Sequence, residues 1–121
     1  MAGFQGQKDF QLNDIPQSIL DEIKKYCLKN RQEESCGLIC FTKNQLIWVA
    51  CDNIAKNRTF NFMIDPRKMI DYDARYVVHS HCVGGANASI LDKKIQAEVC
   101  IPYLIYSIED DKFSIYNNIS V

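Results

Sequence analysis

The sequence predicts a three-layer domain of the α/β (α+β) class, with helices on both sides of one mixed β-sheet. The chain has 121 residues, of which 47% are hydrophobic, and this length supports one well-formed core but not two. Short runs of β-forming residues alternate with segments of helical spacing, in the order helix, hairpin, helix, strand, helix, hairpin. We therefore expect a single domain over residues 14–121, after a flexible, non-periodic arm at residues 1–13.

The first half of the domain is predicted to be a helix followed by a hairpin. The helix begins at Ile15-Pro16, because proline is favoured at the first helical position, and it ends near Asn30. Its apolar residues recur at helical spacing, at Ile19, Leu20, Ile23 and Cys27. Cys36–Phe41 and Leu46–Cys51 are apolar runs rich in β-formers, and the polar residues between them predict a turn.

The second half is predicted to add two helices and the remaining strands. A polar connection at residues 52–58 leads to these elements, and Asp65 is a candidate N-cap for the first helix. The predicted elements are an edge strand at Thr59–Met63, a helix from Asp65-Pro66 to about Ala74, a strand at Arg75–His81, a helix at Ser89–Cys100, and a hairpin formed by Tyr103–Ile108 and Lys112–Tyr116.

Charge and apolar patterning exclude several classes of protein. The chain carries 14 basic and 15 acidic residues, whereas nucleic-acid and anionic-membrane binding need a basic excess, so we expect neither partner. No apolar run reaches the roughly 18 residues of a transmembrane helix, and Met1–Asn13 lacks the apolar core of a secretory signal. The six cysteines form no CxxC pair and several lie in apolar runs, which favours reduced, packed thiols in a cytoplasmic protein.

Both histidines of the chain lie in His79-Ser80-His81, at the end of a predicted apolar strand. Alternate residues of a strand face the same side, so the two imidazoles point together, with Cα atoms about 6.5–7 Å apart. Imidazole is a common metal ligand, and two imidazoles at this spacing can bind one ion. The sequence thus predicts a metal site at the end of this strand.

Ser89 and Asp92 form a second cluster, at the start of the helix that follows. A serine with an acid three residues later is typical of a capping box, in which Ser89 caps the helix and Asp92 interacts favourably with its dipole. The dipole also keeps a first-turn carboxylate ionised, as a metal ligand must be. Two imidazoles and one carboxylate leave one tetrahedral position open, which is typical of catalytic zinc. Cys82, next to His81, is a further candidate as a soft ligand.

A catalytic site of this kind also needs a general base. Glu33 and Glu34 stand just before the first predicted strand, and their position in the sequence alone does not separate them.

Taken together, these residues resemble a known family. Glu34 followed by His79-x-His81-x7-Ser89-x2-Asp92 resembles the JAMM motif of the MPN (Mov34/PAD-1) metallopeptidases, and the context Glu34-x-Cys-Gly-Leu-Ile is similar to the prokaryotic branch. Residues 51–54, 60–66 and 101–103 resemble the connecting segments of the peptidase domain of siphophage tail-assembly protein K. The resemblance extends from about Pro16 to Asn117.

The resemblance implies a JAMM/MPN-type sheet flanked by helices, in a cytidine-deaminase-like three-layer architecture, with one Zn²⁺ per chain. It implies that His79, His81 and Asp92 are the zinc ligands, that Glu34 is the general base, and that Ser89 stabilises the oxyanion of the tetrahedral intermediate. The expected activity is hydrolysis of a peptide or isopeptide bond in a protein or peptide substrate.

The resemblance also implies a biological setting. We expect the protein to act in phage tail assembly or at the tail tip, with other tail-tip proteins as partners, in the cytoplasm of the bacterial host or on the virion tail. A tail protein or a peptide crosslink of the cell wall is the expected substrate.

Two other functions are consistent with the same residues. A catalytically silent MPN-type scaffold in a tail-tip assembly would need no activity, although such relatives usually lose metal ligands. A two-His-one-carboxylate Fe(II) oxygenase would use the same three ligands, although such enzymes more often space them as HxD/E…H and would leave Glu34 without a role.

Overall fold

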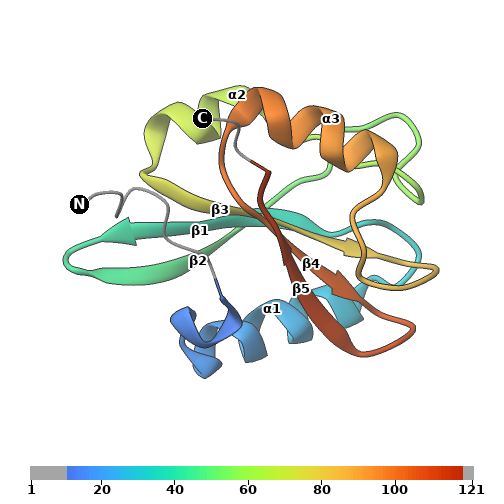
Figure 1. Ribbon diagram of the computed structural model, residues 1–121, viewed down its shortest axis with the longest axis horizontal. Helices are drawn as coiled ribbons and strands as arrows, with labels where there is room; N and C mark the ends of the chain where they lie inside the picture. Colours follow the sequence, from blue (N-terminus) through green and yellow to red (C-terminus); the bar gives the residue numbers. More distant parts are fainter. Residues whose placement is uncertain (1–10, 119–121) are drawn as a thin grey trace.

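The computed structural model describes residues 11–118 and shows a five-stranded sheet with helices on both sides (Figure 1). The helices are α1 (Gln17–Lys29), α2 (Pro66–Asp71) and α3 (Ile90–Val99), and a 3₁₀ helix, η2 (Leu12–Asp14), precedes α1. The strands are β1 (Cys36–Thr42), β2 (Gln45–Cys51), β3 (Ala74–His81), β4 (Tyr103–Ser107) and β5 (Lys112–Tyr116). Of the predicted arm, residues 1–10 lie outside the described residues, whereas Leu12 and Asn13 belong to η2.

The strand order is β2-β1-β3-β4-β5, which places β3 at the centre of the sheet. β1 is antiparallel to both β2 and β3, β3 and β4 are parallel, and β4 and β5 form an antiparallel hairpin. A parallel pair needs a crossover connection, and α3 lies within it. Because β1 and β3 are antiparallel, the start of β1 lies beside the end of β3, with Cys36 opposite His79.

One face of the sheet packs against α1. The apolar stripe predicted for this helix is buried here, and Ile23 is fully inaccessible to solvent. The strands meet it with buried side chains such as Ile39, Val78 and Leu104. We call this surface the α1 face.

The opposite face packs against α2 and α3, which lie together on the other side of the sheet in Figure 1. Its buried strand residues include Leu38, Val77 and Ile105, each next in sequence to a residue of the α1 face, as the strand period of two requires. This second surface, the α3 face, is the one toward which His79 points, because His79 follows Val77 by two residues.

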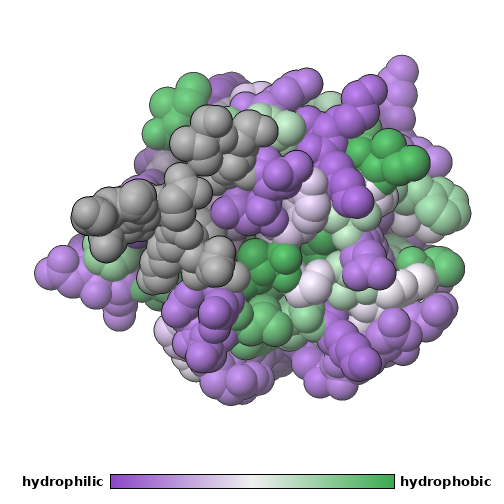
Figure 2. Space-filling model, viewed as in Figure 1, coloured by the Kyte–Doolittle hydropathy of each residue, from purple (hydrophilic) through white to green (hydrophobic). Residues whose placement is uncertain are grey.

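The structure confirms the predicted mixed sheet with helices on both sides, and the predicted helices and hairpins are present. Asp65 also caps α2 as expected, since its side chain accepts a hydrogen bond from Arg67 N. Figure 2 shows hydrophilic side chains over much of one face of the molecule, with apolar groups between them. Within residues 11–118, every helix is too short or too polar to cross a membrane.

Two predicted elements differ from the structure. Thr59–Met63 is not an edge strand: the chain turns, so that the N–H groups of Phe60 and Asn61 both donate to Asn57 O, and later residues bond to a side chain rather than to a neighbouring strand. The second helix ends at Asp71 rather than near Ala74, because Ala74 already pairs with β1.

Candidate metal centre

The two histidines converge at the end of β3, on the α3 face of the sheet. Their Nε2 atoms lie 3.2 Å apart. Ser80, between them, points to the other face, where its Oγ accepts a hydrogen bond from Ser35 N at 2.9 Å. Because side chains alternate along a strand, the two histidines meet on one face of the sheet, and the serine between them bonds β3 to the start of β1 on the other.

Asp92 reaches the same point from the first turn of α3. Ser89 and Asp92 form the predicted capping box, in which Asp92 N donates to Ser89 Oγ at 3.0 Å and Ser89 N donates to Asp92 Oδ2 at 2.9 Å. The same Oδ2 lies 3.2 Å from Nε2 of His79 and 3.1 Å from Nε2 of His81. The cap thus orients the carboxylate toward the two imidazoles.

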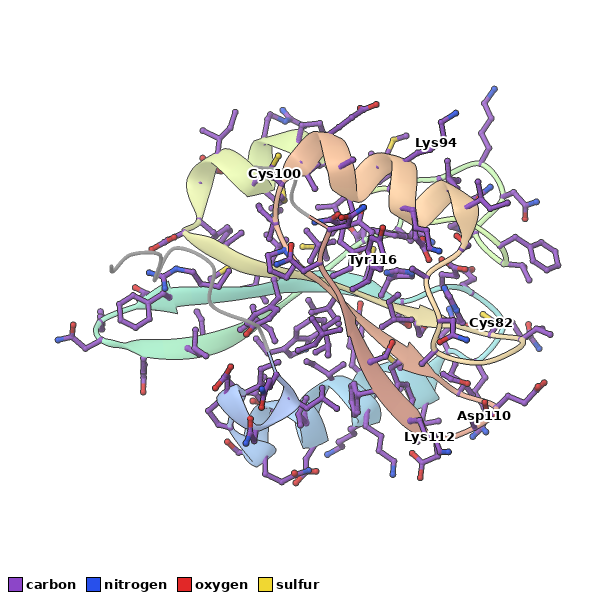
Figure 3. All side chains as sticks on the ribbon, viewed as in Figure 1. Cys82, Lys94, Cys100, Asp110, Lys112 and Tyr116 are labelled. Atoms are coloured by element: carbon purple, nitrogen blue, oxygen red, sulfur yellow. The ribbon has the colours of Figure 1, made fainter. Side chains whose placement is uncertain are left out.

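The spacing of these three atoms suits one small cation. The two nitrogens and the oxygen form a triangle with edges of 3.1 to 3.2 Å. Ligands bound to a tetrahedral zinc ion at 2.0–2.1 Å are separated by about 3.3 Å. Among the described residues, His79, His81 and Asp92 are the one group with a metal-binding arrangement, so Cys82 is not part of it. Figure 3 places Cys82 on the loop after β3, and Cys100 at the far end of α3.

Hydrogen bonding fixes the tautomer of His81. Its Nδ1 lies 2.9 Å from the carbonyl oxygen of Gly85, and a carbonyl can only accept, so Nδ1 carries the hydrogen. In the neutral ring, the lone pair of Nε2 then faces Asp92 Oδ2 and His79, which is unfavourable unless a cation or a proton lies between them. In the absence of metal, the hydrogen bond to Asp92 raises the pKa of His81. The arrangement therefore favours positive charge at this point.

The other two members of the cluster hold the protonation states that metal binding requires. Burial opposes ionisation of Asp92, but the hydrogen bonds from His79 and His81 outweigh it and hold the pKa of this carboxyl well below its usual range. Burial lowers the pKa of His79, which is fully enclosed, so its imidazole stays neutral.

Glu34 and Glu33, the two candidate bases, differ in burial and in their hydrogen-bond partners. Extension of the β1–β3 register places Glu34 opposite His81, on the α3 face, and its side chain is buried. Burial raises the pKa of Glu34 to about 8; the charge of His81 lowers this pKa by a smaller amount, and that of Asp92 raises it. Glu33 is more exposed and accepts a hydrogen bond from Arg58 at 3.1 Å. Of the two glutamates, Glu34 is the one whose charge interacts with His81 and Asp92 of the candidate cluster.

The sequence motif does not predict three further features in or beside the site. A polar cavity of about 390 Å³ adjoins Glu34 and is lined by Lys29, Asp52 and Arg58, among others. Phe62 stacks on His79, with ring centroids 4.2 Å apart. The carbonyl of Gly85 orients His81. A glycine pair after the histidines and an aromatic in the preceding loop are too common to single out from sequence alone.

Comparison with known proteins supports the fold alone. No protein-family model matches the chain, and no curated protein sequence matches it. Among solved structures, the chain is similar to the solution structure of protein DSY2949 from Desulfitobacterium hafniense, with a TM-score of 0.67 and 17% sequence identity, over 88% of this chain and 90% of that chain.

Proposed function

We propose that the chain is a zinc-dependent metallopeptidase of the JAMM type, which hydrolyses a peptide or isopeptide bond. One observation carries the proposal: three ligand atoms from His79, His81 and Asp92 converge, and the buried carboxyl of Glu34 interacts with them electrostatically without belonging to the ligand group. A structural metal site uses four protein ligands, whereas three ligands with a nearby free carboxyl are typical of hydrolytic zinc.

Each residue has a separate role in this proposal. His79, His81 and Asp92 would hold the ion. Zinc in such a site polarises a carbonyl and lowers the pKa of a bound water to about 7. Glu34 takes a proton from the attacking water and passes it to the leaving amine, and its raised pKa suits a base that must also act as an acid near neutral pH. Ser89 uses its Oγ as an acceptor in the helix cap, so its O–H can donate to the developing oxyanion.

The proposed substrate is a protein of a phage tail or a peptide crosslink of the cell wall, and the proposed place of action is tail assembly or the tail tip. This part of the proposal rests on the sequence resemblance to the tail-assembly peptidases.

The proposal is tested by metal content and cleavage together. The full chain is stripped with a chelator, reloaded with Zn²⁺ and incubated with peptides from a digested bacterial proteome and with cell-wall peptides, and new termini are detected by mass spectrometry. We expect one zinc per chain and cleavage that Glu34→Gln abolishes while it retains the zinc. Glu33→Gln, the matched control with the same change of charge one residue away, should still cleave.

The other outcomes separate the alternatives. A chain that binds zinc and cleaves none of these peptides supports the silent scaffold. Turnover that needs Fe²⁺ and oxygen and survives Glu34→Gln supports the oxygenase. Absence of zinc after reloading overturns the metallopeptidase.

A further inference from the structure

The side chain of Asn53 joins two segments that carry different parts of the proposed site. Its Nδ2 donates to the backbone oxygens of Glu34, at 2.8 Å, and Asn61, at 2.9 Å. Its Oδ1 accepts from the N–H groups of Ala55, at 3.0 Å, and Met63, at 3.1 Å. An amide side chain has two N–H donors and one oxygen with two lone pairs, so these bonds use its whole capacity.

Two of these bonds hold the residues on either side of Phe62. The ring of Phe62 stacks on His79 with an interplanar angle of 17°, and Tyr103 packs edge-on against both rings. His79 Nδ1 is buried and has no hydrogen-bond partner among the described residues. The His79 imidazole is therefore oriented by the contacts of its Nε2 with Asp92 and His81 together with aromatic packing, whereas His81 has a hydrogen bond from Nδ1 to Gly85 in place of that packing.

We propose that Asn53 is a positioning residue that fixes Glu34 and the Phe62–His79 stack relative to each other, so that the base and the first metal ligand keep one geometry. The inference rests on the proposed function. The loop that bears Phe62 has no strand partner of its own. Single backbone hydrogen bonds hold it, from Ile54 N to Met63 O at 2.9 Å and from Glu34 N to Arg58 O at 2.6 Å. Asn53 adds bonds to the residues on both sides of Phe62 and to Glu34. Groups that orient a metal ligand typically change metal affinity about 10- to 100-fold when they are removed.

Asn53→Asp tests the bonds with almost no change of shape. The substitution keeps the oxygen that accepts from Ala55 and Met63. It replaces the NH₂ group, which donates to the carbonyl oxygens of Glu34 and Asn61, with an oxygen that cannot donate. We expect Co²⁺ affinity, measured by titration of the visible absorption of the bound ion, to fall about tenfold or more, with altered bands. Phe62→Leu should lower Co²⁺ affinity in the same way, whereas Phe62→Tyr should retain most of the wild-type affinity because it keeps the stacked ring.

Two controls separate positioning from stability. Asn44→Asp makes the same chemical change in the exposed β1–β2 turn and should leave Co²⁺ binding unchanged. Ile19→Ala removes packing from the α1 face and should lower the melting temperature without changing the Co²⁺ spectrum. If Asn53→Asp binds Co²⁺ with the affinity and bands of the wild type, the inference is wrong.

A measurement without metal keeps this inference distinct from the proposed function. In the metal-free chain, the stacked Phe62 ring should shift the His79 ring protons upfield in NMR spectra, and Asn53→Asp should reduce that shift. Retention of the full shift in Asn53→Asp overturns the positioning role whether or not the wild type binds Co²⁺. If the wild type binds neither Co²⁺ nor Zn²⁺ but Asn53→Asp loses the NMR shift, the metallopeptidase proposal is overturned. The positioning of the Phe62–His79 stack by Asn53 is then still supported.

Discussion

The α1 face and the α3 face of the sheet bury different kinds of side chain. The α1 face encloses apolar residues such as Ile23, Val78 and Leu104, which lose no hydrogen bonds when they leave water. The α3 face encloses Glu34 and His79 as well, whose burial shifts their pKa values and leaves a ring nitrogen of His79 unpartnered among the described residues. Both faces contain a cluster of buried apolar residues, and the α3 face carries in addition a polar site whose burial is costly.

The largest expected effect tests the α3 face. His81→Ala removes one of three converging ligand atoms, so we expect zinc affinity to fall about 100-fold or more, while the far-UV circular dichroism stays that of the wild type. Titration calorimetry with Zn²⁺ measures the affinity. Binding at wild-type strength would place the metal elsewhere.

The matching test of the α1 face is Ile23→Ala. This residue is fully buried, and its truncation should lower the free energy of unfolding by about 2–5 kcal/mol, measured with urea. Zinc affinity at a temperature where the variant is folded should be unchanged. A parallel loss of zinc affinity would show that the two faces are not independent.

A smaller effect is expected from Glu34, through pH. Its pKa rises from 4.5 to about 8 on folding, so the folded chain holds a proton that the unfolded chain loses in this range. The contribution of Glu34 to the stability of the metal-free protein should therefore fall as pH rises from 4.5 through 8. Glu34→Gln removes this loss, and we expect its melting temperature to exceed that of the wild type by on the order of 5 °C at pH 8, and to match it near pH 4. A difference in melting temperature between Glu34→Gln and the wild type that stays constant across this pH range would contradict a raised pKa of Glu34.

The smallest effect is expected at the helix cap, which belongs to both fold and site. Ser89→Ala removes the oxygen that accepts from Asp92 N and should cost about 1 kcal/mol of stability. Ser89→Thr keeps a hydroxyl and serves as the control. Urea unfolding of the three proteins gives the comparison, and equal stability of all three would show that the cap contributes nothing.

Local patterns were enough to predict that His79, His81 and Asp92 converge. His79 and His81 share a side because a strand has a period of two, and Asp92 lies in a first turn that Ser89 marks. The preference for Glu34 over Glu33 as the candidate base needed the resemblance, because the position of each glutamate relative to His81 depends on how β1 pairs with β3.

Sequence patterns failed where the chain is ordered by tertiary contacts. Thr59–Met63 contains β-formers, but its backbone hydrogen bonds go to Asn57, to Ile54 and to the side chain of Asn53 and not to a neighbouring strand, and its Phe62 stacks on His79. No periodicity encodes a contact between residues 62 and 79, nor an amide that bonds to four separate backbone groups.

The position of α3 in the crossover between β3 and β4 has one more consequence. Asp92 lies in its first turn, and His81 lies 11 residues earlier at the end of the central strand. An ion held by both would close this loop and tie the crossover helix to the sheet, which limits the conformations open to the intervening chain. Local opening of α3 would then require release of the ion. Amide hydrogen exchange in this helix should therefore slow when metal binds, and the loop should become harder to cut with a protease.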